Sequence, residues 1–176
     1  MEPVLSQVRD GAPVVVRAAR TTDVREIRSL VDLYSPERRL LSKATVTLYE
    51  DVQEFLVVER AENVVGCGAI HVFWEDLAEV RTVAVDPLLQ GQGVGGLILD
   101  QLIARARDIG VARLFCLTFE TAFFASRGFV EIDGTPVDHD VFEQLLQSYD
   151  EGVAEFLELE RVKPNTLGNH RMLLIL

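Results

Sequence analysis

Cysteine is scarce in this sequence, and its scarcity excludes a common class of small secreted protein. The two cysteines, Cys67 and Cys116, each lie inside an apolar run typical of a strand, so buried free thiols are expected and a disulfide framework is not. The three histidines are scattered singly, and no metal-ligand spacing occurs. The sequence therefore predicts no metal site.

Basic side chains are also few, with 17 Lys and Arg against 28 Asp and Glu and a net charge of -11. This charge disfavours nucleic acid and anionic membranes as partners, because their phosphates would be repelled. No apolar run reaches membrane-spanning length, and the first residues lack the basic and apolar stretches of a secretory signal, so we expect a cytoplasmic protein.

The chain length of 176 residues suits one domain with a sizeable core. Antiparallel strands come first and a strand–helix–strand unit follows, which predicts an α/β (α+β) fold with a mixed central sheet of about six or seven strands flanked by helices. We expect residues 1–12 to form a flexible N-terminus and residues 13–176 to form the domain. The expected strands are 14–17, 54–60, 64–72, 78–85, 113–117, 129–132 and 171–176, and the expected helices are 22–31, 46–52, 97–109, 121–127 and 138–149.

A glycine-dense loop separates the strand ending at Val85 from the helix beginning at Leu97, with glycines at 91, 93, 95 and 96. Such a loop presents bare N–H groups beside the positive end of a helix dipole, which suits a phosphate or diphosphate. Dinucleotide-binding glycines would follow the strand directly, whereas residues 86–90 intervene here, and Leu97 stands where a Walker A loop needs lysine. A third pattern, Gln/Arg-x-x-Gly-x-Gly/Ala, is met fully by residues 90–95.

This loop and the segment Phe123–Phe129 resemble two motifs of the GNAT superfamily of acetyl-CoA-dependent N-acetyltransferases. Residues 78–87, 114–118 and 171–174 are similar to the acetyltransferase domain of bacterial N-acetylglutamate synthases, and residues 148–157 and 162–165 to their short actinobacterial form. That form lacks the amino-acid-kinase-like domain that binds arginine. The resemblance implies a GNAT-like sheet splayed between its fourth and fifth strands, with acetyl-CoA as cosubstrate.

The resemblance also implies how acetyl-CoA is held. The glycine loop would bind the diphosphate, and the pantetheine arm would lie along the fourth strand, bonded to the main chain of Val83 and Val85. The cofactor-binding residues expected on this basis are Val83, Ala84, Val85, Gln90, Gly91, Gln92, Gly93, Val94, Gly95 and Gly96.

Two catalytic residues follow from the same resemblance. Glu79 matches a catalytic glutamate, and a carboxylate in a partly apolar cleft can take a proton from an ammonium; the alternative is an exposed strand glutamate paired with Arg81. Thr118 is the nearest match to a hydroxyl that protonates the leaving thiolate, because Phe124 replaces the usual tyrosine; the alternative is a strand-end threonine bonded to its own backbone. A backbone N–H at Thr82 or Val83 would meet the oxyanion.

Carboxylates of an amino-acid acceptor would be met by basic and polar side chains. We expect acetyl transfer to the α-amino group of L-glutamate by direct amine attack, the first step of arginine biosynthesis. The alternative acceptors are glutamine, another amino acid and a protein N-terminus. The alternative to an enzyme is a sensor module that binds coenzyme A without turnover. A homodimer is possible. The expected substrate-binding residues are Lys43, Arg81, Thr82, Lys163, Asn165 and Arg171.

Overall fold

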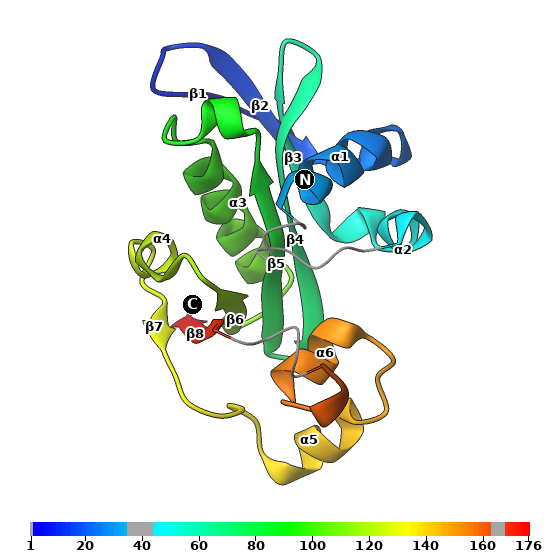
Figure 1. The fold of residues 1–176 in the computed structure, drawn as a ribbon. Helices are drawn as coiled ribbons and strands as arrows, with labels where there is room; N and C mark the ends of the chain where they lie inside the picture. The colour runs from blue at the N-terminus through cyan, green and yellow to red at the C-terminus, as the bar shows by residue number, and fades with distance from the viewer. Residues whose placement is uncertain (1, 35–43, 163–167) are drawn as a thin grey trace. The chain divides into compact units, whose positions relative to one another are not determined.

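The computed structural model describes residues 2–34, 44–162 and 168–176 (Figure 1). In these residues an eight-stranded sheet has the order β1-β2-β3-β4-β5-β6-β8-β7. The chain forms two compact units, the first made of Met1–His71 and Val80–Ile109 and the second of Val72–Glu79 and Gly110–Leu176. A mixed sheet flanked by helices confirms the predicted fold class, with more strands than expected.

The first unit contains an antiparallel meander. Its strands are β1 (Val4–Gln7), β2 (Pro13–Ala18), β3 (Phe55–Arg60) and most of β4 (Asn63–Trp74). The predicted hairpin between β3 and β4 is confirmed, and its turn residues Ala61 and Glu62 have left-handed φ angles of 48° and 65°. This pair of positive φ angles is typical of the tight turn that matches strand twist.

Strand β1 corrects our prediction of a loose segment at residues 1–12. It pairs with β2 from Val4↔Val16 to Gln7↔Pro13. The turn between them is built from local polar chemistry, because Asp10 accepts a hydrogen bond from the N–H of Ala12 at 2.9 Å and Gly11 takes a φ of 80°. A strand of four residues beside such a turn carries too short an apolar pattern to be recognised in the sequence.

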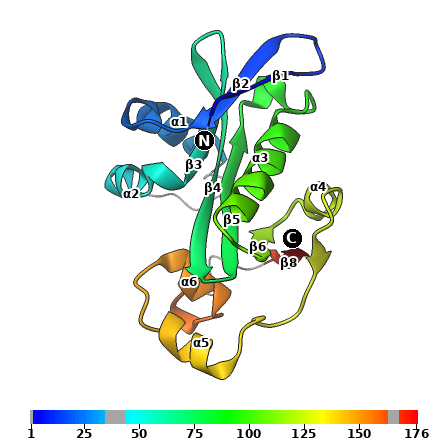
Figure 2. The same ribbon diagram turned by 180° about the vertical axis from the view of Figure 1, so that it is seen from behind.

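Helices cover both faces of the sheet in the first unit. They are α1 (Val24–Tyr34), α2 (Thr45–Glu50) and α3 (Val94–Asp108), with short 3-10 turns at Thr21–Asp23, Val52–Glu54 and Pro87–Leu89. α3 lies on the opposite face from α1 and α2 (Figures 1 and 2). Alternation along β4 explains this, since Cys67 and Ala69 join the core under α1 while Gly66 and Gly68 face Ile98 of α3.

The second unit contains the end of β4 and the start of β5 (Leu77–Val85). Here β5 runs parallel to β6 (Arg113–Thr118), which pairs antiparallel with β8 (His170–Ile175), and β7 (Val130–Glu131) pairs with β8. The β5–β6 pairing covers only Leu77–Glu79, although both strands run on. The short pairing agrees with the predicted splay between these strands.

The helices of the second unit are α4 (Thr121–Ala125), α5 (His139–Leu145) and α6 (Glu151–Phe156), followed by a 3-10 turn at Glu160–Val162. The helix predicted over residues 138–149 is confirmed as α5, although it ends earlier, at Leu145, and the next helix, α6, was not predicted. Asp138 and Asp150 each cap one N-terminus, accepting from the N–H groups of Val141 and Val153. Phe115 and Phe156 stack edge to face at 4.9 Å in the core between α6 and β6.

Candidate active site

The glycine loop ends at the N-terminus of α3. Gly91 and Gly93 have φ angles of 76° and 95°, which side chains with a Cβ disfavour. Gly93 is the N-cap, and no side-chain cap from the described residues closes the first turn. The N–H groups of Val94, Gly95 and Gly96 therefore have no acceptor within the helix. A Cβ at Gly91 or Gly93 would meet nothing within 4 Å, so both positions face open space.

Contacts that the sequence reasoning missed hold this loop in place. The N–H of Arg9 donates to the carbonyl of Gln92 at 2.9 Å, which ties the β1–β2 turn to the loop. The amide Nε2 of Gln90 donates to the hydroxyl of Tyr34 at 2.7 Å, and that hydroxyl donates to the carbonyl of Val85. No local sequence pattern predicts these contacts, because the residues that form them lie far apart in the chain.

Thr82 interrupts the extended strand β5. Its φ of 59° is left-handed, at a cost of about 1–3 kcal/mol for a non-glycine residue. The fully buried thiol of Cys67 donates to its carbonyl at 3.7 Å, and burial raises the pKa of Cys67 to about 12, so the thiol keeps its proton. Side chains alternate between the two faces of a sheet only where the backbone is extended. Because Thr82 is not extended, the single face predicted for Glu79, Arg81, Val83 and Val85 does not continue past Thr82.

Glu79 is buried in the second unit, with only 4% of its surface exposed. It lies opposite Phe115 in the register of β5 and β6. Burial raises the pKa of the neighbouring Cys116, and the Glu79 charge acts in the same direction. This burial excludes the alternative of an exposed strand glutamate, and the catalytic role of Glu79 stays a prediction.

Thr118 ends β6 and is also buried. Its Oγ1 accepts a hydrogen bond from the N–H of Glu120 at 2.9 Å, which is the local backbone contact considered as the alternative to catalysis. This contact uses only an acceptor site, so the hydroxyl proton can still be donated elsewhere. Phe124, in the place of the motif tyrosine, packs at 5.2 Å against both Phe123 and Phe129 and offers no proton.

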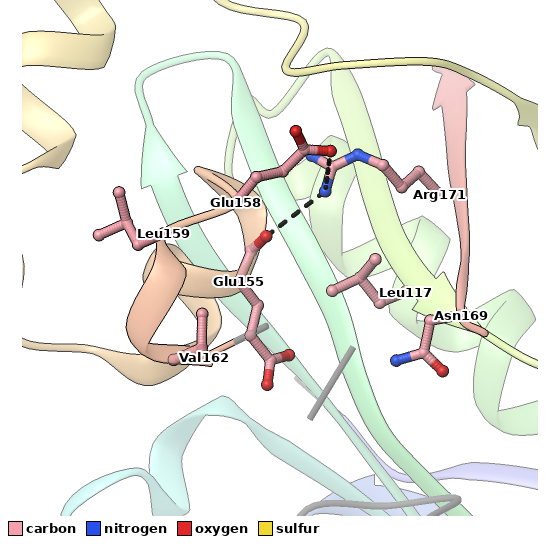
Figure 3. Close-up of a pocket in the computed structure, with 7 residues that line it drawn as sticks. All are labelled: Leu117, Glu155, Glu158, Leu159, Val162, Asn169 and Arg171. Atoms are coloured by element: carbon pink, nitrogen blue, oxygen red, sulfur yellow. Dashed lines mark hydrogen bonds and ion pairs between the residues drawn. The ribbon is translucent and has the colours of Figure 1, made fainter. Parts of the chain in front are cut away.

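A cavity of about 260 Å³ lies in the second unit, beside the end of β6 (Figure 3). Its lining combines three apolar side chains with two carboxylates, an amide and a guanidinium. The lining residues are Leu117, Glu155, Glu158, Leu159, Val162, Asn169 and Arg171.

Arg171 lies on the cavity wall, but backbone carbonyls use most of its donors. Its Nη2 donates to Phe156 at 2.6 Å, its Nη1 to Glu155 at 3.4 Å and its Nε to Gly134 at 3.0 Å. The guanidinium also lies over the ring of Phe115 at 5.0 Å. Burial lowers the pKa of Arg171, while the Glu158 and Glu79 carboxylates oppose this shift. Arg171 thus fastens the C-terminal end of α6, a role that its charge alone did not predict.

The remaining polar groups of the lining are mainly hydrogen-bond acceptors. The Glu155 residue is 7% exposed, and Figure 3 shows its carboxylate on the side away from Arg171. The Oδ1 atom of Asn169 is buried and finds no hydrogen-bond partner among the residues that the structure describes. These oxygens favour a ligand group that donates hydrogen bonds over another carboxylate.

Arg81, predicted to bind substrate, lies in the first unit in a charged cluster with Glu54 and His71. Its Nη2 is 3.3 Å from Glu54, whose other oxygen is 2.6 Å from Nδ1 of His71. Burial raises the pKa of Glu54, but the His71 hydrogen bond and both neighbouring charges outweigh it, so the net pKa is lowered. Lys43, Lys163 and Asn165 lie outside the described residues. In the described part of the chain, no group of three or more His, Cys, Asp or Glu is placed to hold a metal ion.

Strand β5 thus carries the buried carboxylate of Glu79 and leads into the glycine loop at the N-terminus of α3. The chain belongs to the Acetyltransferase (GNAT) family, whose family model matches residues 24–131.

Its relatives narrow the class. The amino-acid acetyltransferase of Mycobacterium tuberculosis is 58% identical over 171 residues, covering 96% of this chain and 97% of the relative. An amino-acid acetyltransferase of Neisseria meningitidis is 36% identical over 70% of this chain and 29% of that protein. No helix among the described residues is long and apolar enough to cross a membrane.

Two solved structures that this chain resembles belong to the same class of enzyme or carry its ligands. Rv2747 from Mycobacterium tuberculosis, in complex with CoA and NLQ, has a TM-score of 0.89 at 58% identity and covers 92% of this chain and 98% of its own. N-acetylglutamate synthase from Neisseria gonorrhoeae, complexed with coenzyme A and N-acetyl-glutamate, has a TM-score of 0.74 at 27% identity, covering 93% of this chain and 35% of that one. This chain is an acetyl-CoA-dependent amino-acid acyltransferase.

Proposed function

We propose that this amino-acid N-acetyltransferase transfers the acetyl group of acetyl-CoA to the α-amino group of L-glutamate, the first step of arginine biosynthesis, in the cytoplasm. The observation that carries the catalytic part is Glu79, a buried carboxylate on the strand that leads to the glycine loop. The choice of acceptor is supported by the similarity to N-acetylglutamate synthase.

The loop fits a coenzyme A diphosphate because its N–H groups have no acceptor within the helix and its surroundings are open. Gln90, Gly91, Gln92, Gly93, Val94, Gly95 and Gly96 would hold the diphosphate, and the main chain of Val83, Ala84 and Val85 would hold the pantetheine arm. Acetyl-CoA supplies an activated thioester, and the protein supplies position and proton transfer.

Glu79 would take the proton that the ammonium of the acceptor must lose before it can attack. No nucleophile with an orienting base is needed, because the free amine attacks directly. The left-handed turn at Thr82 re-aims the backbone of β5 and would point the N–H of Thr82 or Val83 at the acetyl oxygen. One such donor lowers the barrier by about 3 kcal/mol.

Thr118 would donate a proton to the leaving thiolate. A thiol with an ordinary pKa of about 8.5 is roughly 1.5 units above neutral pH, which makes this step worth about 2 kcal/mol. The apolar packing of Phe124 is tolerable for that reason, since thiolate leaves without strong acid help.

The acceptor would be held by Lys43, Arg81, Thr82, Lys163, Asn165 and Arg171. In the first unit Glu54 fixes the position of the Arg81 guanidinium and offsets part of its charge, while the other N–H groups of the fork could meet a carboxylate. The Arg171 contribution would be the shape of the cavity wall more than a free fork, because its donors reach Phe156, Glu155 and Gly134.

Glutamine is the second candidate acceptor, and the cavity favours it. A side-chain amide could donate to the Glu155 or Glu158 carboxylate or to Oδ1 of Asn169, whereas a second carboxylate placed there would be repelled.

The experiment is a free-thiol release assay with acetyl-CoA and a panel of glutamate, glutamine, other amino acids and a short peptide with a free N-terminus. Glutamate with the highest kcat/KM supports the proposal. If kcat/KM is at least tenfold higher for glutamine than for glutamate, glutamine is the acceptor. Turnover of peptides alone identifies protein N-termini as the acceptor. CoA binding without any turnover indicates a sensor. Light scattering on the same sample decides between a monomer and a homodimer.

A variant sharpens the choice of acceptor. If the Glu155 carboxylate contacts the acceptor amide, Glu155→Gln should shift the ratio of kcat/KM values toward glutamate. Glu143→Gln, on the exposed face of α5, removes the same charge from the same unit and serves as the matched control.

A further inference from the structure

We propose that Tyr34 is a positioning residue that holds the coenzyme A diphosphate loop in its binding conformation. Tyr34 is the last residue of α1, and it lies 56 positions before Gln90 in the sequence. Its hydroxyl donates to the carbonyl of Val85 and accepts from Nε2 of Gln90 at 2.7 Å. The inference rests on the proposed assignment of the loop to the diphosphate.

The ring of Tyr34 is fixed by the core beneath α1. Val24, Ile27 and Val31 are buried at spacings of three and four residues, and Tyr34 continues this series at the next position of the same face. Tyr34 packs against the cluster that these residues form with β3 and β4. The aromatic ring therefore serves as a rigid arm, and only the hydroxyl at its tip reaches polar groups.

The two groups that the hydroxyl joins stand at the two ends of one segment. Val85 is the last residue of β5, and Gln90 opens the glycine-loop motif. Between them Asp86 accepts from the N–H of Leu88 at 2.9 Å and caps the 3-10 turn. The Tyr34 hydroxyl thus bridges the first and last residues of the segment 85–90, which leads from β5 into the glycine loop.

A loop held in advance loses less conformational entropy when it binds a ligand. The bridge reaches a main-chain carbonyl and a side-chain amide and includes no group that takes part in acetyl transfer. Its loss should weaken coenzyme A binding and leave the chemical step unchanged, which a catalytic role for Tyr34 would not do.

The test is Tyr34→Phe, which keeps the ring and removes the bridge, with CoA binding measured by calorimetry and turnover by thiol release. We expect a rise of about 3- to 10-fold in the Kd for CoA, which is about 0.7–1.4 kcal/mol, and a kcat at saturating acetyl-CoA within twofold of the wild type. Tyr49→Phe, which removes a tyrosine hydroxyl from the partly exposed side chain on α2, is the matched control and should leave the Kd unchanged.

A double-mutant cycle with Gln90→Met separates positioning from general destabilisation. Gln90 lies on the exposed loop, so its substitution does not threaten folding, and we expect the effect of Tyr34→Phe to be smaller in the Gln90→Met background. An unchanged Kd in Tyr34→Phe, fully additive effects, or a lowered kcat at constant Kd would overturn the proposal. Because the main readout is binding, an enzyme that acetylates no amino acid contradicts the proposed acceptor and leaves this test intact.

Discussion

Replacement of Glu79 by glutamine tests the proposed base directly. The side chain is 4% exposed on β5, and the amide has the same shape, so packing against Phe115 and its neighbours is preserved. Loss of a general base costs about 10²–10⁴-fold in rate, which is about 2.7–5.4 kcal/mol of barrier at 1.36 kcal/mol per tenfold. We expect kcat to fall by that factor in Glu79→Gln.

The pH profile gives the signature of the lost base. Glutamine cannot accept the ammonium proton, so the variant must wait for free amine, whose fraction rises about tenfold per pH unit below its pKa. We expect the rate of Glu79→Gln to climb steadily between pH 7 and 9 while the wild-type rate levels off. Calorimetry should give the same Kd for CoA in both, because the proposed cofactor contacts are mainly backbone groups of residues 83–96.

Glu75→Gln is the matched control, since it removes an exposed carboxylate four positions earlier in the same hairpin. Its kcat and pH profile should follow the wild type. A Glu79→Gln enzyme that retains at least half of the wild-type rate, or that loses CoA affinity in proportion to rate, would refute the assignment of Glu79 as the base.

Three further outcomes follow from the packing and the loop. Gly93→Ala should lower the free energy of unfolding by about 1–2 kcal/mol, from the left-handed φ alone, and should also weaken CoA binding. Urea unfolding measures the stability and calorimetry measures the binding, and an unchanged stability would contradict the strain argument. Gly68→Ala should cost about 1–3 kcal/mol by overpacking, because its Cβ would lie 2.7 Å from the stiff Cγ2 of Ile98, and thermal unfolding would show no loss if α3 can shift freely. Burial raises the pKa of both Cys67 and Cys116, so neither should react with a thiol reagent at pH 8 until the protein is denatured, and rapid labelling of the native protein would contradict this.

The features predicted from the sequence were those with a local signal. Alternating apolar residues and the glycines at 91–96 fixed the strand–loop–helix unit, because backbone geometry and side-chain type coincide there. α6 was missed because its helix is only six residues long, and its cap, Asp150, falls just beyond the helix predicted before it.

The contacts that organise the site carry no such signal. Tyr34 reads as one more core position of α1, and its bond to Gln90 depends on where the fold brings two distant segments. The prediction that Arg171 binds the acceptor rests on its charge, whereas the fold also brings its nitrogens to the carbonyls of Gly134, Glu155 and Phe156. Charge is visible in a sequence, whereas the partner of a charge is a property of the tertiary structure.

The edge strand β1 has a practical consequence for protein engineering. Shortening the chain at residue 12, as its polar start invites, would uncover the hydrogen-bonding groups of β2 along Pro13–Val16 and offer them to other molecules as a template for aggregation. The same truncation would remove the Arg9 amide, which donates a hydrogen bond to the carbonyl of Gln92. We therefore expect the shortened enzyme to aggregate more readily and to bind acetyl-CoA more weakly. Affinity tags are better attached before Val4 than substituted for the residues that follow it.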